Sequence, residues 1–321
     1  MMIDTTLAFV FPGQGAQAVG MLADVASQYP EIQQTFDEAS AVLAYDLWDL
    51  VQNGPAEKLD KTTHTQPALL AASYAIWKIF QSRNFPKPAM LAGHSLGEYT
   101  ALVCANALTF ADAIKLVAAR GRYMQEAVTE GSGAMAAIVG LEDATVLALC
   151  QQAKSADEIA SPANYNSLGQ VVVAGHRAAV ERTIQLAKDQ GAKLAMFIPV
   201  SVPSHCELMR PAAQRLMTQL ATVALQQPQI PVVSNVDVSI YSDAQSIRDG
   251  LVRQLYSPVR WVETIQYFVN KGITTIVECG PNKILTGLNK RIDKRLELFP
   301  TLDRVHLEAV FKLENEGARN V

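Results

Sequence analysis

Residues 89–105 read AMLAGHSLGEYTALVCA, and this stretch decides which kind of fold the chain can form. The apolar run at 89–92 is typical of a buried strand, and the residues from 96 to 105 favour a helix. Between them, residues 93–97 (GHSLG) fit the pattern G-x-S-x-G, which places Ser95 on a sharp strand-to-helix turn. The same five letters also occur by chance in turns, but the flanking strand and helix favour a nucleophile elbow.

Strands and helices alternate through most of the chain, which predicts an α/β fold. Short apolar runs that read as strands occur at 6–11, 89–92, 232–235 and 275–278. Helical periodicity separates these runs, an arrangement typical of a mostly parallel sheet that helices cover on both faces. We expect this core to comprise residues 1–128 and 200–321.

The pattern changes between residues 129 and 199, where the expected order of elements is β-α-β-β-α-β. Strands are expected at 134–139, 159–165, 170–174 and 193–200, and helices at 144–153 and 178–190. This order is the split βαβ or ferredoxin-like pattern. We therefore expect residues 129–199 to form a ferredoxin-like subdomain inserted into the core.

The composition argues against several classes of protein. The 321 residues carry a net charge of −4, so a nucleic-acid partner is not expected. No apolar run is long enough to span a bilayer, and residues 1–15 read as a first strand because they lack the basic segment of a signal peptide. The four cysteines have no CxxC spacing, which favours reduced thiols in the cytoplasm over disulfides or a metal site.

A serine nucleophile needs a base, and the chain has five histidines. His205 follows segment 202–204, where the chain returns from the insertion to the core, and a cleft is expected there. His94 adjoins Ser95, but neighbouring side chains on a turn point apart. On position alone, His205 is either the base or a structural histidine. Cys206 could be a reactive thiol, although Ser95 fits the role of nucleophile better.

Arg120 lies in an otherwise apolar part of the helix expected at 112–126. A buried guanidinium needs an anionic partner, because burial of an unpaired charge is costly. That partner is either a carboxylate of the protein, which is the commoner case, or the carboxylate of a substrate held by the two-pronged guanidinium.

The loop FPGQGAQ at 11–17 follows the first expected strand and is rich in glycine. Such a loop can bind phosphate, but this one has neither GxGxxG nor the lysine of a P-loop. It can instead bring a backbone N–H beside the serine, where it would stabilise an oxyanion.

Taken together, these segments resemble the malonyl-CoA:acyl carrier protein transacylases and the acyltransferase domains of fatty acid and polyketide synthases. The resemblance covers nearly the whole chain, about residues 7–291, and its motifs occur in the family's order. The motifs are FPGQGAQ (11–17), TQPAL (65–69), GHSLGEYTAL (93–102), RGRYMQEA (120–127), GSGAMAAI (131–138), NYNSLGQVVVAG (164–175), VPSH (202–205), QLYSPVRW (254–261) and ECGPNKIL (278–285).

The resemblance implies a hydrolase-like α/β core with a ferredoxin-like insertion, and it implies roles for individual residues. Ser95 is expected to be the acylated nucleophile, with His205 as its base and later its acid. Gln14 and the backbone N–H of Leu96 are expected to form the oxyanion hole. Arg120 is expected to hold the free carboxylate of the malonyl group.

Four further residues are expected around these groups. The backbone carbonyl of Gln254 resembles the one that orients the histidine, the role that an aspartate has in ordinary triads. We also expect His94 to help orient the groups of the site, and we do not expect it to react. Asn164 and Asn166 match positions that line the entrance for pantetheine.

The resemblance implies that the chain transfers a malonyl group from malonyl-CoA to acyl carrier protein through a malonyl-serine, in the service of fatty acid synthesis. Neither a metal nor another cofactor is expected, and the chain is expected to be a cytoplasmic monomer that binds coenzyme A thioesters and the carrier protein. The basic run at 290–295 is either a docking site for that acidic carrier or a solvated helix face.

Two alternatives stay open at this point. A serine esterase or thioesterase would use the same elbow, although that class usually places its histidine near the C-terminus. A non-catalytic module of a synthase would have no use for the matched catalytic residues.

Overall fold

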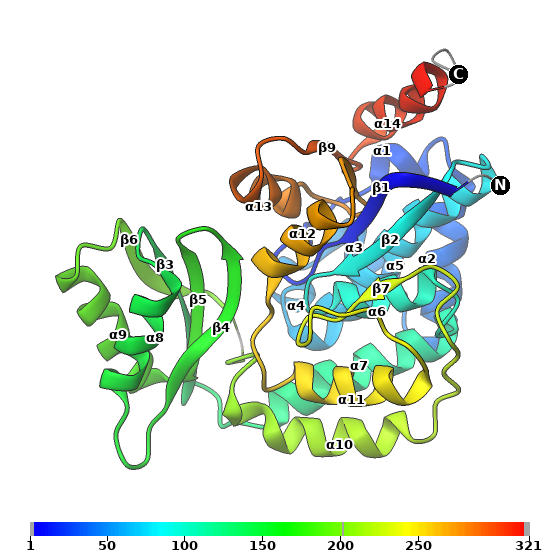
Figure 1. Cartoon of the computed structure of the whole chain (residues 1–321). Coiled ribbons are helices and arrows are strands. Elements are labelled where there is room, and N and C mark those ends of the chain that lie inside the picture. The colour runs from blue at the N-terminus through cyan, green and yellow to red at the C-terminus, as the bar shows by residue number, and fades with distance from the viewer. Residues whose placement is uncertain (1–2, 201, 318–321) are drawn as a thin grey trace.

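Two β-sheets organise the chain, a five-stranded parallel sheet and a separate four-stranded antiparallel sheet (Figure 1). The computed structural model describes residues 3–200 and 202–317. In spatial order the parallel sheet consists of β7 (Val232–Val233), β2 (Lys87–Gly93), β1 (Ile3–Phe11), β8 (Thr275–Glu278) and β9 (Glu297–Pro300). In spatial order the antiparallel sheet consists of β4 (Ala160–Ser167), β5 (Gln170–His176), β3 (Gly133–Val139) and β6 (Leu194–Ile198).

Helices fill the connections between these strands. In the first part of the chain they are α1 (Ala23–Ala26), α2 (Pro30–Leu43), α3 (Leu47–Asn53), α4 (Ala56–Leu59), α5 (Thr62–Ser82), α6 (Gly97–Cys104) and α7 (Phe110–Glu126). In the second part they are α8 (Asp143–Ala153), α9 (Arg177–Asp189), the 3₁₀ helix η1 (Glu207–Met209), α10 (Arg210–Leu220), α11 (Ala244–Gln254), α12 (Trp261–Asn270), α13 (Ile284–Ile292) and α14 (Arg304–Gly317).

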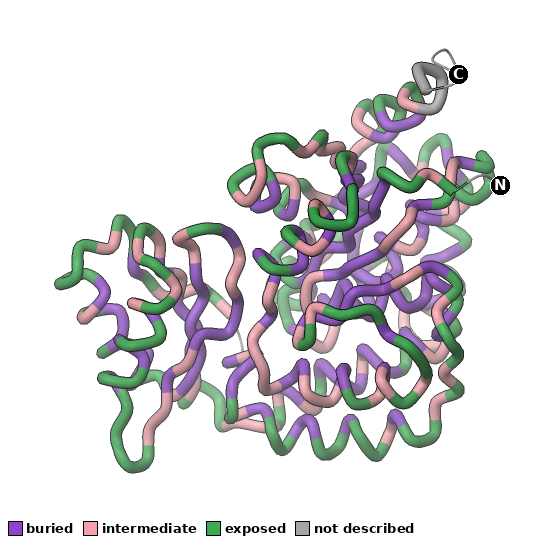
Figure 2. Tube along the Cα trace, in the orientation of Figure 1, coloured by how far each residue is buried: buried purple, intermediate pink, exposed green. Residues whose placement is uncertain are grey.

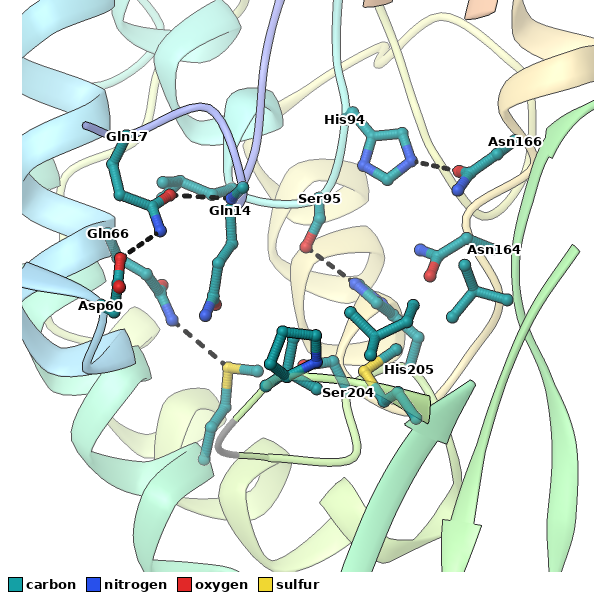
Figure 3. Close-up of a pocket in the computed structure, with 18 of the residues that line it drawn as sticks. Gln14, Gln17, Asp60, Gln66, His94, Ser95, Asn164, Asn166, Ser204 and His205 are labelled. Atoms are coloured by element: carbon teal, nitrogen blue, oxygen red, sulfur yellow. Dashed lines mark hydrogen bonds between the residues drawn. The ribbon is translucent and has the colours of Figure 1, made fainter. Parts of the chain in front are cut away.

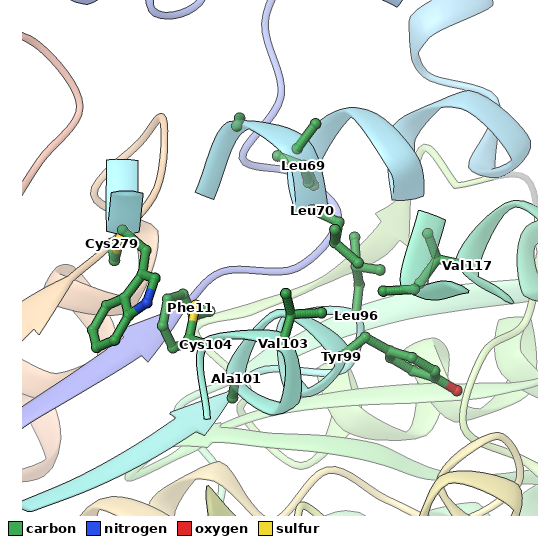
Figure 4. Packing of buried hydrophobic residues seen from close by; sticks show 14 of the residues in the cluster. Phe11, Leu69, Leu70, Leu96, Tyr99, Ala101, Val103, Cys104, Val117 and Cys279 are labelled. Carbon is green, nitrogen blue, oxygen red and sulfur yellow. The ribbon is translucent and has the colours of Figure 1, made fainter. Parts of the chain in front are cut away.

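The central strand β1 separates two hydrophobic clusters, because successive side chains of a strand point to opposite faces. Leu7, Phe9 and Phe11 belong to a large cluster with helices α2, α5, α6 and α7, whereas Ala8 and Val10 face α12 and α13. Figure 4 shows part of the large cluster, and the tube in Figure 2 is buried along the second halves of β1 and β2. Helices therefore cover the sheet on both faces, as the alternation of strands and helices in the sequence predicted.

The antiparallel sheet has a hydrophobic cluster of its own, beneath α8 and α9. Its elements follow the expected order β-α-β-β-α-β between α7 and η1. Met135 and Val172 point to the opposite face of this sheet, where Cys206 packs against them. One face of the sheet is thus closed by its own helices, and the other face is turned toward the larger part of the chain (Figure 1).

Two elements differ from what the sequence predicted. Strand β9 was not expected, because its sequence, ELFP, is short and contains a charge and a proline; it pairs with β8 at the edge of the sheet. Residues 66–81 favour a helix with Pro67 in its first turn, but helix α5 begins at Thr62 and Pro67 lies inside it. The Thr65 hydroxyl, which donates to the carbonyl oxygen of Leu59 at 2.6 Å, ties down this earlier start.

The turn between β2 and α6 requires glycine at positions 93 and 97, because neither position has room for a side chain. A Cβ added to Gly93 would lie 1.8 Å from the carbonyl carbon of Gly97, and one added to Gly97 would lie 2.0 Å from the carbonyl oxygen of Phe11. Ser95, between the two glycines, has φ +52°, a left-handed conformation that is strained for a residue with a side chain. The chain therefore forms the sharp turn predicted from G-x-S-x-G.

We predict that Gly97→Ala destabilises the protein by about 3 kcal/mol or prevents folding, because backbone atoms of β1 occupy the space of the new methyl group. Gly287→Ala in α13 is the matched control, since an added Cβ there meets no atom within 4 Å. Alanine favours a helix over glycine by about 1 kcal/mol, so the control should be as stable as the wild type or more stable. Urea unfolding of the three proteins measures the difference, and equal stabilities would contradict the steric account.

Candidate active site

Ser95 and His205 are in direct contact. The Ser95 Oγ lies 2.7 Å from the His205 Nε2 (Figure 3). The His205 Nδ1 lies 2.7 Å from the backbone oxygen of Gln254. A carbonyl oxygen can only accept, so the proton of the neutral imidazole is on Nδ1 and Nε2 is left to accept from the serine hydroxyl. The arrangement is that of a nucleophile and its general base, oriented by a third group.

The carbonyl of Gln254 is available because helix α11 ends at this residue. The last carbonyls of a helix have no partner within it, and the helix end carries partial negative charge. This charge favours the imidazolium that forms when His205 accepts a proton. The end of a helix thus supplies both the hydrogen-bond acceptor and the charge that an aspartate supplies in other serine enzymes.

His205 is buried and has φ +62°, so its backbone, like that of Ser95, is in the left-handed region. Its backbone N–H donates to the carbonyl oxygen of Leu255 at 3.0 Å, which fixes the loop against the end of α11. Burial and the nearby charge of Arg120 lower the pKa of His205 to about 3. The imidazole is therefore neutral, as a base must be before it accepts a proton.

Arg120 is 2 % exposed, and neutral oxygens hold its guanidinium. Its Nη1 donates to the Gln66 Oε1 at 2.9 Å, and its Nη2 donates to the Gln254 Oε1 at 2.8 Å and to the Ser95 Oγ at 3.2 Å. Its Nε is buried without an acceptor, and the guanidinium forms no ion pair with a carboxylate of residues 3–200 and 202–313. Of the two interpretations of Arg120, this geometry favours a cation that waits for an anionic ligand.

Two backbone N–H groups beside Ser95 are free to bind an oxyanion. Leu96 precedes the first residue of α6, and neither its N–H nor that of Gln14 has an acceptor among the described residues. The loop that carries Gln14 is pressed against the elbow, because a Cβ on Gly13 would lie 2.6 Å from the backbone oxygen of His94. The geometry thus brings together the two residues expected to form the oxyanion hole.

His94 points away from the nucleophile, as neighbouring side chains on a turn should. Its Nε2 lies 2.8 Å from the Asn166 Oδ1 (Figure 3). Its ring centroid lies 5.5 Å from that of Trp261. Asn164 is 6 % exposed and lies in the same wall as Asn166, on strand β4. His94 therefore joins the elbow to the antiparallel sheet.

These residues line one pocket of about 400 Å³ between the two sheets. The core contributes Ser95, His205 and Arg120, together with the loop around Gln14. The antiparallel sheet contributes its open face, with residues Met135, Asn164, Asn166, Val172 and Ile198. The cleft expected where the insertion meets the core is thus present.

Sequence reasoning missed the residues that hold the elbow from behind. The Asn235 Oδ1 accepts from the backbone N–H of Ser95 at 2.7 Å, and its Nδ2 donates to the carbonyl oxygen of Gly93 at 2.6 Å. Glu98 accepts from Tyr241 and from the backbone of Asn235. The one signal in the sequence was Glu98, a carboxylate beside the otherwise apolar helix segment YTALVCA; Asn235 gave none.

Other chemistries receive no support from the described residues. Cys206 is buried, its Sγ donates to the carbonyl oxygen of Pro203 at 3.2 Å, and burial raises its pKa to about 12, so it is not a reactive thiol. Among the side chains of residues 3–200 and 202–313, no three of His, Cys, Asp or Glu are grouped to hold a metal ion. No helix there has the length and apolar character that a membrane span requires.

Comparison with known proteins agrees with the geometry. A family profile described as the acyl transferase domain matches residues 8–317. The malonyl CoA-acyl carrier protein transacylase of Escherichia coli K12 is 56 % identical, with 90 % of this chain and 93 % of the relative aligned. That of Bacillus subtilis is 41 % identical over 97 % of this chain and 99 % of the relative.

Solved structures give the same result. The acyl carrier protein S-malonyltransferase of Vibrio cholerae is 56 % identical and superposes with a TM-score of 0.93, covering 95 % of this chain and 99 % of its own. A malonyl-transacylase in complex with its type II polyketide synthase acyl-carrier protein is 52 % identical, with a TM-score of 0.94 over 96 % of this chain and 99 % of its own. The chain belongs to the acyl transferase domain family.

Proposed function

We propose that this chain transfers a malonyl group from malonyl-CoA to the phosphopantetheine thiol of acyl carrier protein, through a malonyl ester on Ser95. The observation that carries the proposal is the guanidinium of Arg120, which lies 3.2 Å from the Ser95 Oγ without a carboxylate partner among the described residues. A buried cation at that distance suits an acyl group that ends in a carboxylate, since one carbon separates the two carbonyl groups of malonate. The names of the relatives agree with this assignment.

In the first half-reaction, the His205 Nε2 accepts the proton of Ser95 while the Oγ attacks the thioester carbonyl. The N–H groups of Leu96 and Gln14 bind the oxyanion of the tetrahedral intermediate, and loss of one such donor typically costs about a hundredfold or more in rate. The intermediate collapses, the C–S bond breaks, and the coenzyme A sulfur takes the proton from Nε2.

The second half-reaction runs in the opposite direction with a different thiol. The phosphopantetheine thiol gives its proton to the His205 Nε2 and attacks the ester carbonyl. The bond from the carbonyl carbon to the Ser95 Oγ then breaks, and Nε2 returns the proton to the serine. Throughout, the carbonyl of Gln254 holds the Nδ1–H, and no resident cofactor takes part.

Arg120 has two effects in this cycle. It fixes the acyl group by pairing with the malonyl carboxylate, which orients the thioester toward Ser95. The same pairing removes an unbalanced positive charge from the neighbourhood of His205, where that charge lowers the pKa. Binding of an anionic acyl group therefore makes the histidine a stronger base, an effect that an uncharged acyl group would lack.

Serine hydrolysis is the alternative, because water could also attack the acyl-serine. The unpaired Arg120 favours a transferase of dicarboxylic acyl groups, since an ordinary esterase has no use for a buried cation beside its nucleophile. The two reactions are separated by the rates at which acyl carrier protein and water remove the acyl group from Ser95.

We further propose that the larger unit is a hydrolase-like core, residues 1–128 and 200–321, and that residues 129–199 form a ferredoxin-like insertion. The strand order β4-β5-β3-β6 supports the second assignment, because it is the order of a split βαβ sheet. Residues 1–2, 201 and 318–321 of these ranges lie outside the described residues. That the protein is a cytoplasmic monomer stays a prediction.

We predict that malonyl-CoA adds one malonyl group to the wild-type protein and none to Ser95→Ala, as measured by intact mass spectrometry. Holo acyl carrier protein should then remove the group and become malonylated. Loss of the group to water at the same rate would favour the hydrolase. If wild-type protein with intact fold forms no adduct, the chemistry proposed for Ser95 is wrong.

Arg120→Ala should lower kcat/KM for malonyl-CoA by about a hundredfold or more, because a charge-assisted bidentate pair is lost, and should spare acetyl-CoA in comparison. Arg122→Ala is the matched control, since Arg122 lies on the same helix but is exposed. Acylation rates with each thioester give the ratio. A malonyl preference that survives in Arg120→Ala would refute the assignment of the carboxylate site.

The lowered pKa of His205 predicts how reactivity depends on pH. Since the base stays neutral down to about pH 3, acylation of Ser95 by the uncharged ester p-nitrophenyl acetate should change by less than about twofold between about pH 8 and pH 5.5. An ordinary histidine, with a pKa of about 6.5, would lose about tenfold over this range. Burst kinetics measure the rate, with Ser95→Ala as background and circular dichroism as a check of the fold. Because burial raises the pKa of Glu98 to about 7, the profile is repeated with Glu98→Gln, and an ionisation near about 6.5 in both proteins would contradict the prediction.

A further inference from the structure

Glu98 is a buried carboxylate that does not line the pocket. It is the second residue of α6 and is 0 % exposed, so nothing in solution can satisfy its oxygens. Its Oε1 accepts from the Tyr241 hydroxyl at 2.7 Å and from the backbone N–H of Asn235 at 3.0 Å. Its Oε2 accepts from the side-chain amide of Gln254. A carboxylate placed so deeply calls for a reason, because burial of this group is costly.

The side-chain amide of Gln254 can adopt either of two orientations, and its hydrogen-bond partners determine where its oxygen and its nitrogen point. The Nε2 donates to Glu98 on one side and to the backbone oxygen of Ser95 at 2.9 Å on the other. Both partners can only accept, provided that Glu98 is ionised. The oxygen of the amide is therefore left to face Arg120, whose Nη2 donates to it at 2.8 Å.

This orientation matters for the guanidinium. Arg120 has only two amide oxygens, those of Gln66 and Gln254, and the Ser95 hydroxyl as acceptors among the described residues. If the amide of Gln254 were reversed, its NH₂ group would face the Nη2 of a cation, donor against donor. The guanidinium would then lose an acceptor and turn out of the position in which it faces the acyl group.

We propose that Glu98 is a positioning residue, whose ionised carboxylate fixes the side-chain amide of Gln254 and, through it, aims Arg120 at the carboxylate of the acyl group. The proposal rests on the malonyl transfer proposed above. Glu98 touches neither substrate nor the reacting atoms, and the contact through which it orients Arg120 is its hydrogen bond with Gln254. Its effect is therefore on the choice between charged and uncharged acyl groups.

The surroundings of Glu98 fit an ionised group at the pH of an assay. Burial raises its pKa to about 7, while its hydrogen-bond donors and the charge of Arg120 oppose the rise. Measurements at about pH 8 therefore start from the carboxylate.

The experiment compares wild type with Glu98→Gln at about pH 8. The introduced amide must direct its oxygen to the backbone N–H of Asn235, which cannot rotate, so its NH₂ group faces the NH₂ group of Gln254, donor against donor. The side chain of Gln254 must then reverse or move away from position 98, and either change disturbs its contact with Arg120. We expect the ratio of kcat/KM for malonyl-CoA to that for acetyl-CoA to fall about tenfold or more, chiefly through KM for malonyl-CoA. An unchanged ratio in a folded Glu98→Gln protein would overturn the proposal.

Tyr241→Phe is the control for damage to the same buried network. It removes a donor to Glu98, which raises the pKa of that carboxyl, so wild type, Tyr241→Phe and Glu98→Gln are also compared at about pH 9, where the ionised carboxylate is favoured. Tyr241→Phe should then lower stability and keep the malonyl preference. A loss of preference in Tyr241→Phe equal to that in Glu98→Gln would mean that general loosening causes the effect, and would overturn the proposal.

Gln254→Met tests the connecting residue and keeps the backbone carbonyl that His205 needs. We expect it to lose the malonyl preference, and Glu98→Gln should then change the ratio by less than about twofold in the Gln254→Met background, since residues that act in series are not additive. Independent, multiplying effects would overturn the proposal. Should Glu98→Gln not fold, a Gln254→Met protein with wild-type preference would overturn it equally.

The failure of this inference is distinct from the failure of the proposed function. If wild-type protein does not form malonyl-Ser95 and pass the group to the carrier, the proposed function is wrong. If wild-type protein does so and the ratio is unmoved in Glu98→Gln, the function stands and only the role of Glu98 is wrong.

Discussion

The close approach of three backbone segments at Gly93 and Gly97 is the constraint on which the rest of the site depends. No side chain fits where these residues meet each other and the end of β1. The approach forces Ser95 into a left-handed conformation, and Asn235 holds that conformation by bonding to both sides of the turn. Because the strain sits in a turn that a parallel sheet supports, the serine oxygen has one position, and every other functional group is arranged around that position.

The electrostatics of the site follow from the burial of a cation, Arg120, and a neutral imidazole, His205, in the same pocket. The charge of Arg120 disfavours the protonated form of His205, and burial acts in the same direction. A guanidinium held by neutral oxygens remains able to bind an anion, whereas one paired with a protein carboxylate would not. The carboxylate that lies nearby, Glu98, accepts from Gln254 and forms no ion pair with Arg120, so it leaves the guanidinium free to contact a ligand.

What the sequence predicted well was encoded locally. The elbow, the alternation of strands and helices, and the β-α-β-β-α-β order rest on short patterns in which each residue constrains its neighbours. The position of His205, where the chain re-enters the core, made it a candidate among five histidines, but only the family resemblance assigned it the role of base. Asn235 and Gln66 could not be predicted, since their contacts join segments far apart in the chain. The roles of Gln14, Gln254 and the two asparagines came from family resemblance and not from any pattern in the residues themselves.

The partner of His205 is a backbone carbonyl, and this has a consequence for inherited variation. Every amino acid carries the same carbonyl group, so no missense change at position 254 can delete the acceptor itself. A serine enzyme with an aspartate in this place can lose the acceptor through one altered codon. Here the acceptor is lost only when the end of α11 is moved, by an insertion, a deletion or a proline that redirects the chain. A missense mutation at position 254 therefore leaves in place the carbonyl that orients His205.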